Sequence, residues 1–382
     1  MSIGRMMVAL GVVTMVVGGG HYFIWARLVR DAALPQPWAR VATALLIALA
    51  VMVPVGMILT RFVPSIGHII AYPLFIWMGA FFWFFLAAIA LQVTKVGLHL
   101  GAVDPVRRLF LSRVLAGGTV AVVAGMTALA VRRGLAALQV KNVDIALRRL
   151  PAALNGLTIA QLSDIHVGPT IGREFIADMV AKTNELTPDI IVITGDLVDG
   201  SVDDLREGVA PLADLRARYG VFFVTGNHEY YSGADAWCAE VTRLGIRVLR
   251  NERVEVGPPG ATIDLAGLPD WSGGQFSPDH KPDLPRTLAG RDVERELILL
   301  AHQPRSVLEA AEHGVGLQLS GHTHGGQIWP WNFFVALQQK WVEGLFREKD
   351  TQLYVSPGTG YWGPPMRLGT RAEITRLTLR RS

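Results

Sequence analysis

The chain is long and apolar, and its charges are unevenly distributed. It has 382 residues, of which 51% are hydrophobic, and its mean hydropathy is +0.33. Charged residues are scarce before about residue 135 and frequent after it, so we expect a membrane region followed by a globular region with one substantial core. The net charge of +4 includes no dense basic block, which argues against a nucleic-acid partner. One cysteine, Cys238, excludes an internal disulfide.

Four uncharged stretches in the first 135 residues predict membrane-spanning helices. Roughly 20 apolar residues cross the hydrocarbon core of a bilayer, and each stretch meets or nearly meets that length. His21 and His68 lie in or beside these stretches, and we expect both rings to reach the lipid headgroups from near the span ends. The membrane region is residues 1–135, with predicted spans at residues 6–26, 41–60, 68–93 and 114–131.

Basic residues beside the spans predict the orientation. The first and third loops carry seven Lys or Arg residues, against four near the helix ends on the other side. Because Lys and Arg concentrate in cytoplasmic loops, the C-terminal region is predicted to lie outside the cytoplasm. The segment from Arg107 to Val131 also resembles a twin-arginine export signal. We therefore expect a multi-pass protein of a bacterial-type inner membrane.

From Gly156 onward, short apolar runs end in polar residues of the metal-ligand type. Two helical patterns, Arg173–Leu186 and Val202–Arg218, lie between the first three runs, which predicts an α/β domain with largely parallel strands. In such sheets the functional site gathers at the carboxyl ends of the strands. The runs are Leu157–Leu162 before SDIH, Ile190–Ile193 before TGDLVD, Val221–Val224 before TGNHE, Leu297–Leu300 before AHQP, and Val315–Leu319 before SGHTHGG.

The polar residues after these runs have the composition of a binuclear metal centre. Two carboxylates, one amide oxygen and four imidazoles are too many for one ion and about the number that two ions sharing a carboxylate need. Mixed nitrogen and oxygen ligands favour Mn, Fe or Zn over Ca or Mg. Two further histidines, His280 and His313, lie in polar segments and are predicted to be solvated. The predicted ligands are Asp164, His166, Asp196, Asn227, His302, His322 and His324.

Five motifs in one order, DIH, GDLVD, GNHE, AHQ and GHTH, resemble those of the calcineurin-like metallophosphoesterases. GHTHGGQ, LNGLTIAQLSDIHVG and the C-terminal YVSPGTGYWGPPMRLGTRAEITRLTL are similar to the YkuE-like branch in particular. The resemblance covers about residues 140–382 and leaves the membrane region outside. It implies a metallophosphoesterase β-sandwich flanked by helices over residues 157–382, after a linker and first strand at residues 136–156.

The resemblance also implies a role for each motif residue. His228 would be catalytic, donating to the leaving-group oxygen or stabilising charge on the phosphoryl group. Glu229 would orient His228, and Asp199 would fix the turn or a ligand imidazole. Asp164, His166 and His324 would hold the first metal, Asn227, His302 and His322 would hold the second, and Asp196 would bridge them.

The implied chemistry is hydrolysis of phosphate esters. Two ions about 3.5–4 Å apart lower the pKa of a bridging water, so that metal-bound hydroxide exists near neutral pH and attacks phosphorus in line. We expect a membrane-anchored phosphoesterase that cleaves a phosphodiester or pyrophosphate, with a lipid as one possible substrate. Two alternatives stay open. One is a cytoplasm-facing hydrolase of the UDP-2,3-diacylglucosamine type in lipid A synthesis, and the other is a non-catalytic metal-binding membrane sensor.

An aromatic segment follows the GHTHGGQ motif. Residues 328–346 are rich in large aromatics and poor in charges. Because Trp is enriched at membrane interfaces, we expect Trp331, Phe333 and Phe334 to contact the bilayer and to admit a lipid phosphoester to the metals. The alternative is that these rings pack onto the domain core. The six aromatics are Trp329, Trp331, Phe333, Phe334, Trp341 and Phe346.

Overall fold

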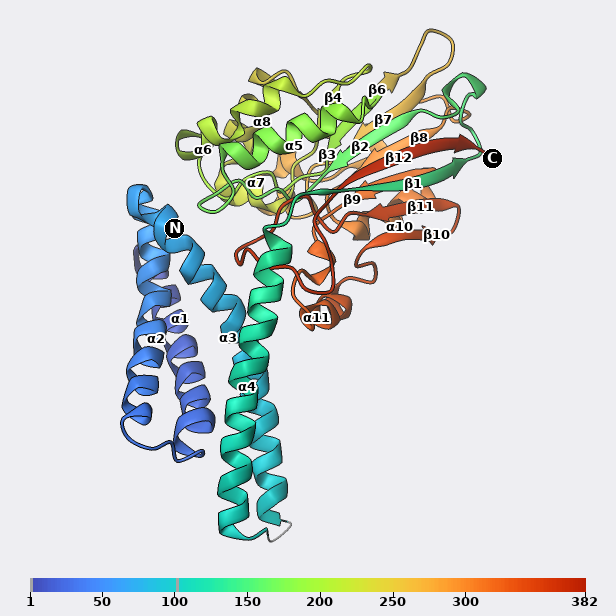
Figure 1. The fold of residues 1–382 in the computed structure, drawn as a ribbon. Helices are drawn as coiled ribbons and strands as arrows, with labels where there is room; N and C mark the ends of the chain where they lie inside the picture. The colour runs from blue at the N-terminus through green and yellow to red at the C-terminus, as the bar shows by residue number, and fades with distance from the viewer. Residues whose placement is uncertain (1–2, 101–102) are drawn as a thin grey trace. The chain divides into compact units, whose positions relative to one another are not determined.

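The computed structural model describes residues 3–100 and 103–382 (Figure 1). Its contacts divide the chain into two compact units. One unit comprises the residues up to Arg132 together with the short segment Gly363–Met366. The other comprises Arg133–Trp362 and Arg367–Ser382 and carries both sheets. We call them the membrane unit and the sheet unit.

The membrane unit contains four helices that are long and apolar enough to cross a membrane. This confirms the prediction of four apolar N-terminal helices. The candidate spans run from Gly11 to Arg30, Trp38 to Thr60, Ile66 to Gly97 and Pro105 to Gly134. The helices are α1 (Ile3–Trp25), which continues through a wider turn at Ala26–Arg30, α2 (Trp38–Phe62), α3 (Pro64–Leu100) and α4 (Pro105–Gly134).

The prediction for His21 was wrong. This side chain is buried, its Nε2 accepts a hydrogen bond of 3.0 Å from the indole N–H of Trp77, and its ring stacks on Phe81. The reason is that the helical path continues from Trp25 to Arg30, so His21 lies further inside the span than the predicted end at residue 26 placed it. His68, by contrast, is exposed.

The sheet unit is built from two six-stranded sheets. Most neighbouring strands are parallel, and each of the five predicted strand segments forms a strand. The first sheet has the order β1 (Gln139–Leu147), β12 (Glu373–Arg381), β2 (Thr158–Leu162), β3 (Ile190–Ile193), β4 (Val221–Phe223) and β5 (Arg247–Val248). The second has the order β10 (Gly344–Glu348), β11 (Thr351–Val355), β9 (Leu317–Ser320), β8 (Leu297–Leu300), β7 (Ile263–Gly267) and β6 (Glu252–Val256).

A continuous apolar core lies between the two sheets. It joins side chains such as Ile159 and Val192 of the first sheet to Leu265 and Ile298 of the second, all of them fully buried. Helices α5 (Arg173–Glu185), α6 (Val202–Val209) and α8 (Ala234–Arg243) pack their apolar residues with those of the first sheet (Figure 1). Helices α9 (Leu284–Thr287) and α10 (Val307–Glu312) cover the second sheet. The predicted β-sandwich flanked by helices is confirmed.

One predicted helix was too long. The pattern over Val202–Arg218 forms α6 only as far as Val209, followed by a 3-10 turn at Ala210–Asp214. Pro211 explains the change because it lacks the backbone N–H that an α-helix needs at that position. The chain then becomes extended at Leu215, which returns it to the sheet for β4.

Candidate metal centre

The polar motifs meet at the carboxyl ends of five strands of the two sheets. Asp164 and His166 follow β2, and Asp196 follows β3. Helix α7 (Asn227–Ser232) follows β4 and begins with Asn227 and His228. The remaining predicted ligands follow β8 and β9, and they are His302, His322 and His324.

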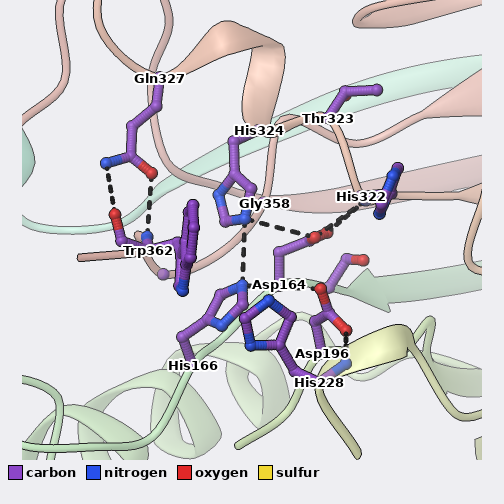
Figure 2. A network of polar contacts seen from close by, with 12 residues as sticks. Asp164, His166, Asp196, His228, His322, Thr323, His324, Gln327, Gly358 and Trp362 are labelled. Atoms are coloured by element: carbon purple, nitrogen blue, oxygen red, sulfur yellow. Dashed lines mark hydrogen bonds and ion pairs between the residues drawn. The ribbon is translucent and has the colours of Figure 1, made fainter. Parts of the chain in front are cut away.

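One cluster of ligand atoms is formed by Asp164, His166 and His324, all of them buried (Figure 2). The Nε2 atoms of His166 and His324 lie 3.0 Å apart. The Nε2 atom of His324 also lies 3.5 Å from a carboxylate oxygen of Asp164. Three potential ligand atoms therefore converge on one point.

A second cluster is formed by Asp196, His302 and His322. The Nε2 atom of His302 lies 3.1 Å from Oδ2 of Asp196 and 3.2 Å from Nδ1 of His322. The same Oδ2 of Asp196 is 3.8 Å from Nε2 of His166 in the first cluster. Asp196 thus lies between the two clusters.

Hydrogen bonds behind the ligands direct free lone pairs into both clusters. Nδ1 of His302 donates to the carbonyl oxygen of Thr194 at 2.7 Å, and Nδ1 of His166 donates to Asp199 at 3.0 Å. In a neutral imidazole this leaves Nε2 as an acceptor, which is the usual arrangement of a metal-binding histidine. The Oδ1 atom of Asn227 is buried without a hydrogen-bond partner. These residues fit divalent metal ions.

The backbone at the clusters is held in a conformation that side chains rarely adopt. In the described part of the chain, ten residues other than glycine have a positive φ, and five of them are predicted ligands. Such conformations cost free energy and concentrate at functional sites. Gln327, in the same loop as His324, also has a positive φ, of 49°, although it is not a predicted ligand. The five ligands are Asp164, His166, Asp196, His322 and His324.

Two motif positions must be glycine because neighbouring side chains leave no room for a Cβ atom. A Cβ atom at Gly226 would collide with the carboxylate of Asp196, and one at Gly321 would collide with the side chains of Ser163 and Asp164. Neither neighbour can move without displacing a predicted ligand. The GNHE and GHTH motifs therefore need glycine so that adjacent loops can meet at the clusters.

Asp199 holds two imidazoles with one oxygen. Its Oδ1 accepts from Nδ1 of His166 at 3.0 Å and from Nδ1 of His228 at 2.6 Å. Burial would raise the pKa of Asp199, but the attraction of the two imidazoles and their hydrogen bonds lower it to about 2. A carboxylate that stays ionised can orient both rings and leave Nε2 of His228 outside this hydrogen bond.

Glu229 does not perform the predicted role of orienting His228. Its carboxylate is fully buried and accepts three backbone N–H groups, from Asp196 at 3.0 Å, Leu197 at 2.8 Å and Gly226 at 2.6 Å. Glu229 therefore fixes the loop after β3 to the loop after β4. Asp199 orients His228 instead, because the turn after β3 brings GDLVD beside the start of α7.

The prediction for His280 was also wrong. This side chain is buried rather than solvated, and its Nε2 lies 2.8 Å from Nη1 of Arg250 and 3.3 Å from Asp235. These partners are 30 and 45 residues away along the chain, so the local polar sequence did not indicate them.

The aromatic residues after the last motif are divided between surface and core. Trp331, Phe333 and Phe334 lie on helix α11 (Trp331–Gln338) and are 50%, 60% and 45% exposed. Trp341 is buried in a small cluster with Val307 and Leu353. Helix α11 begins against the ligand loop, because the backbone of Gly326 lies close to Asn332.

Sequence reasoning missed Tyr231 and Trp362, which adjoin His228, and Gln327, which binds Trp362. The side-chain amide of Gln327 makes two hydrogen bonds to the backbone of Trp362 (Figure 2). The rings of Tyr231 and Trp362 lie next to the His228 imidazole. Gln327 is part of GHTHGGQ and Trp362 is part of YVSPGTGYWGPP. Their pairing spans 35 residues, and neither segment by itself indicates it.

Comparison with known proteins identifies the family to which this chain belongs. A model described as calcineurin-like phosphoesterase matches residues 157–326. The chain is also 42% identical over 306 residues to a Bos taurus protein named transmembrane protein with metallophosphoesterase domain, covering 76% of this chain and 68% of that one. The chain belongs to the calcineurin-like phosphoesterase family. The family match ends at residue 326, so Gln327, helix α11 and Trp362 lie beyond it.

Two further relatives also have metallophosphoesterase in their names. A Danio rerio protein of the same name is 41% identical over 252 residues, which is 64% of this chain and 58% of that one. The Bacillus subtilis metallophosphoesterase YkuE is 32% identical over 240 residues, which is 60% of this chain and 82% of that one. This chain thus spans 58% to 68% of the length of the two transmembrane relatives.

Proposed function

We propose that this membrane protein hydrolyses phosphodiesters or pyrophosphates with two divalent metal ions, Mn, Fe or Zn. The observation that carries the proposal is the two largely buried ligand clusters, with Asp196 a member of one and 3.8 Å from His166 of the other. Asp164, His166 and His324 would hold one ion, and Asn227, His302 and His322 the other. When bound, two such ions supply a water of lowered pKa and stabilise charge on the phosphoryl oxygens.

The protein's own residues would orient the catalytic imidazole and supply a proton to the leaving group. His228 is only partly buried, and Asp199 binds its Nδ1, so in the imidazolium form its Nε2 can donate a proton to the leaving-group oxygen. The backbone N–H of His228 donates to Oδ1 of Asp196 at 2.9 Å, which fixes the start of α7 to the shared carboxylate. The catalytic imidazole therefore stays in register with both clusters.

Removal and replacement of metal test the proposal. Purified full-length protein should lose activity towards bis(p-nitrophenyl) phosphate in chelator and regain it with Mn²⁺. Asp196→Asn should abolish this activity, because the proposed bridging carboxylate touches both clusters, whereas Asp178→Asn on the exposed face of α5 should behave as wild type. Full activity of Asp196→Asn, or two bound metals per chain without any hydrolysis, would remove the proposal. The second result would favour a metal-binding sensor.

The exposed apolar side chains of helix α11 support a lipid phosphoester as the substrate. None of the helix residues is buried, and Trp331, Phe333, Phe334 and Leu337 are all substantially exposed. Exposed apolar side chains of this density are typical of segments that lie in a membrane interface. Helix α11 also begins against the loop that carries His324, which would bring a lipid headgroup close to the metals.

Two substrates with the same leaving group separate lipid access from chemistry. In proteoliposomes, replacing Trp331, Phe333 and Phe334 together by Ser should lower hydrolysis of phosphatidyl-p-nitrophenol roughly tenfold or more and spare bis(p-nitrophenyl) phosphate. Replacing the exposed Val293 by Ser provides a control outside α11. Equal losses on both substrates would indicate a structural role for the helix and contradict the lipid proposal.

The orientation of the sheet unit decides between an extracytoplasmic phosphoesterase and a cytoplasm-facing hydrolase. We propose that it lies outside the cytoplasm, from the excess of basic residues in the first and third loops. A reporter fused after Ser382 that is active only outside the cytoplasm should therefore be active. An inactive reporter, with full activity of a cytoplasmic reporter at the same position, would favour the cytoplasm-facing pyrophosphate hydrolase.

A further inference from the structure

Two exposed aromatic rings stand beside the proposed catalytic imidazole. The ring centroid of Tyr231 lies 5.3 Å from that of His228, and the ring centroid of Trp362 lies 5.5 Å from it. Both rings are steeply inclined to the imidazole, at 67° and 75°. Tyr231 is 65% exposed and Trp362 is 55% exposed, so neither ring is committed to the core.

The position of Trp362 is fixed by a dedicated contact. The side-chain oxygen of Gln327 accepts from the backbone N–H of Trp362 at 2.9 Å, and its side-chain nitrogen donates to the Trp362 carbonyl at 3.0 Å (Figure 2). Gln327 is largely buried and has a positive φ, as five of the predicted ligands do. Its backbone carbonyl also accepts from the N–H of Leu368 at 2.9 Å. An exposed indole is therefore held by a buried, strained residue of the ligand loop.

We propose that Trp362, assisted by Tyr231, is a stacking site for a flat ring on the leaving group of the substrate. The inference rests on the proposed function, because His228 would serve the leaving group and the two rings adjoin His228. Aromatic side chains stack on planar rings with a gain of roughly 1–3 kcal/mol, whatever the identity of the ring. The ring could be a nucleobase, separated from the phosphate by a sugar, or an aryl group attached close to the phosphate. Gln327 is a positioning residue that acts through Trp362.

Matched ligands with and without a ring test the stacking site. Phenylphosphonate and methylphosphonate, which resist hydrolysis, represent the aryl source, and AMP and ribose 5-phosphate represent the nucleobase source. Calorimetry on Mn²⁺-loaded full-length protein should show at least roughly fivefold tighter binding of the ring-bearing member in one or both pairs. The affinity ratio of a pair is the dissociation constant of the ringless ligand divided by that of the ring-bearing ligand. The pair with the larger affinity ratio identifies the source of the ring.

Substitutions assign the ratio to Trp362. Trp362→Ala should bring it close to one, and Trp362→Phe should retain most of it because the flat face remains. Gln327→Ala should reduce the ratio while metal content stays at the wild-type value. Trp38→Ala, an exposed tryptophan of the membrane unit, is the matched control and should leave the ratio unchanged.

The outcomes separate this inference from the proposed function. A wild-type ratio near one in both pairs, or an unchanged ratio in Trp362→Ala, would overturn the stacking site. Loss of metal in Gln327→Ala would show that this residue supports the ligand loop rather than Trp362. Because calorimetry needs no turnover, a protein that binds metal and shows the ratio but hydrolyses no ester would fail only the proposed function.

Discussion

The carboxylate of Asp199 lies 2.6 Å from Nδ1 of His228, and the same oxygen lies 3.0 Å from Nδ1 of His166. One partly buried anion therefore connects a proposed metal ligand to the proposed proton donor. Both imidazoles depend on it for orientation, so a change at Asp199 should affect metal binding and chemistry together.

We expect Asp199→Asn to lower both metal affinity and kcat, each by roughly 10–100-fold, the usual effect of losing a carboxylate behind a ligand histidine. The physical reason is that a neutral amide stabilises neither imidazole in the required orientation. Metal titration and steady-state kinetics measure the two effects. Asp203→Asn on the exposed surface of α6 is the control. If metal affinity were unchanged and kcat lowered, Asp199 would be shown to act on His228 and not on the ligand His166.

His228→Ala should separate chemistry from metal binding. If His228 protonates the leaving group, the variant should keep about two metals per chain and lose roughly 10²–10⁴ in kcat. An ester with a poor leaving group should lose more than a nitrophenyl ester, because nitrophenolate departs without a proton. Metal analysis and kinetics on both esters check this. Loss of a metal ion would instead place His228 among the ligands.

Glu229→Gln should destabilise the sheet unit. The carboxylate accepts three backbone N–H groups, and an amide nitrogen in its place would face at least one of them as a second donor. A buried hydrogen-bonding group left unsatisfied costs about 1–3 kcal/mol, which lowers the Tm of a domain of this size by roughly 3–10 °C. Thermal unfolding in chelator measures this without a metal contribution. Glu185→Gln, at the exposed end of α5, is the control and should unfold at the wild-type Tm. A wild-type Tm for Glu229→Gln would show that its three hydrogen bonds do not stabilise the fold.

Cys238 should react slowly with thiol reagents. Burial, with a smaller contribution from the charge of Glu229, raises the pKa of its thiol to about 11 despite the nearby Arg250. Because a raised pKa keeps the thiol protonated, the thiolate fraction at pH 8 is roughly two hundredfold below that of a free cysteine, and alkylation slows in proportion. The rate should rise through pH 9–11 and become fast in urea. Since this is the only cysteine, mass spectrometry reads the reaction directly, and a rate at pH 8 equal to that in urea would contradict the prediction.

The sequence determined the parts of this protein that depend on local pattern. Uncharged stretches of about 20 residues predict spans because length and polarity alone decide whether a helix can cross a bilayer. Apolar runs ending in Asp, Asn or His predict strand ends, and the carboxyl ends of parallel strands share one edge. Asp164 and Asp196 were placed together in this way, and the structure brings them to neighbouring clusters.

Two motif glycines lie where backbones approach closely. Gly226 and Gly321 each precede a predicted ligand, and each position has no room for a Cβ atom. Family resemblance added the division of ligands between two ions, which spacing by itself does not provide.

Only the tertiary structure decided which polar groups pair across the fold. Glu229 is adjacent to His228 in sequence, yet it binds backbone N–H groups of two other loops, while Asp199, 29 residues away, binds His228. His21 and His280 are buried by helices and loops that the local pattern does not specify. The contact between Gln327 and Trp362 joins segments 35 residues apart. Such pairings depend on how strands are ordered and loops are packed, and no local period of apolar residues encodes that order.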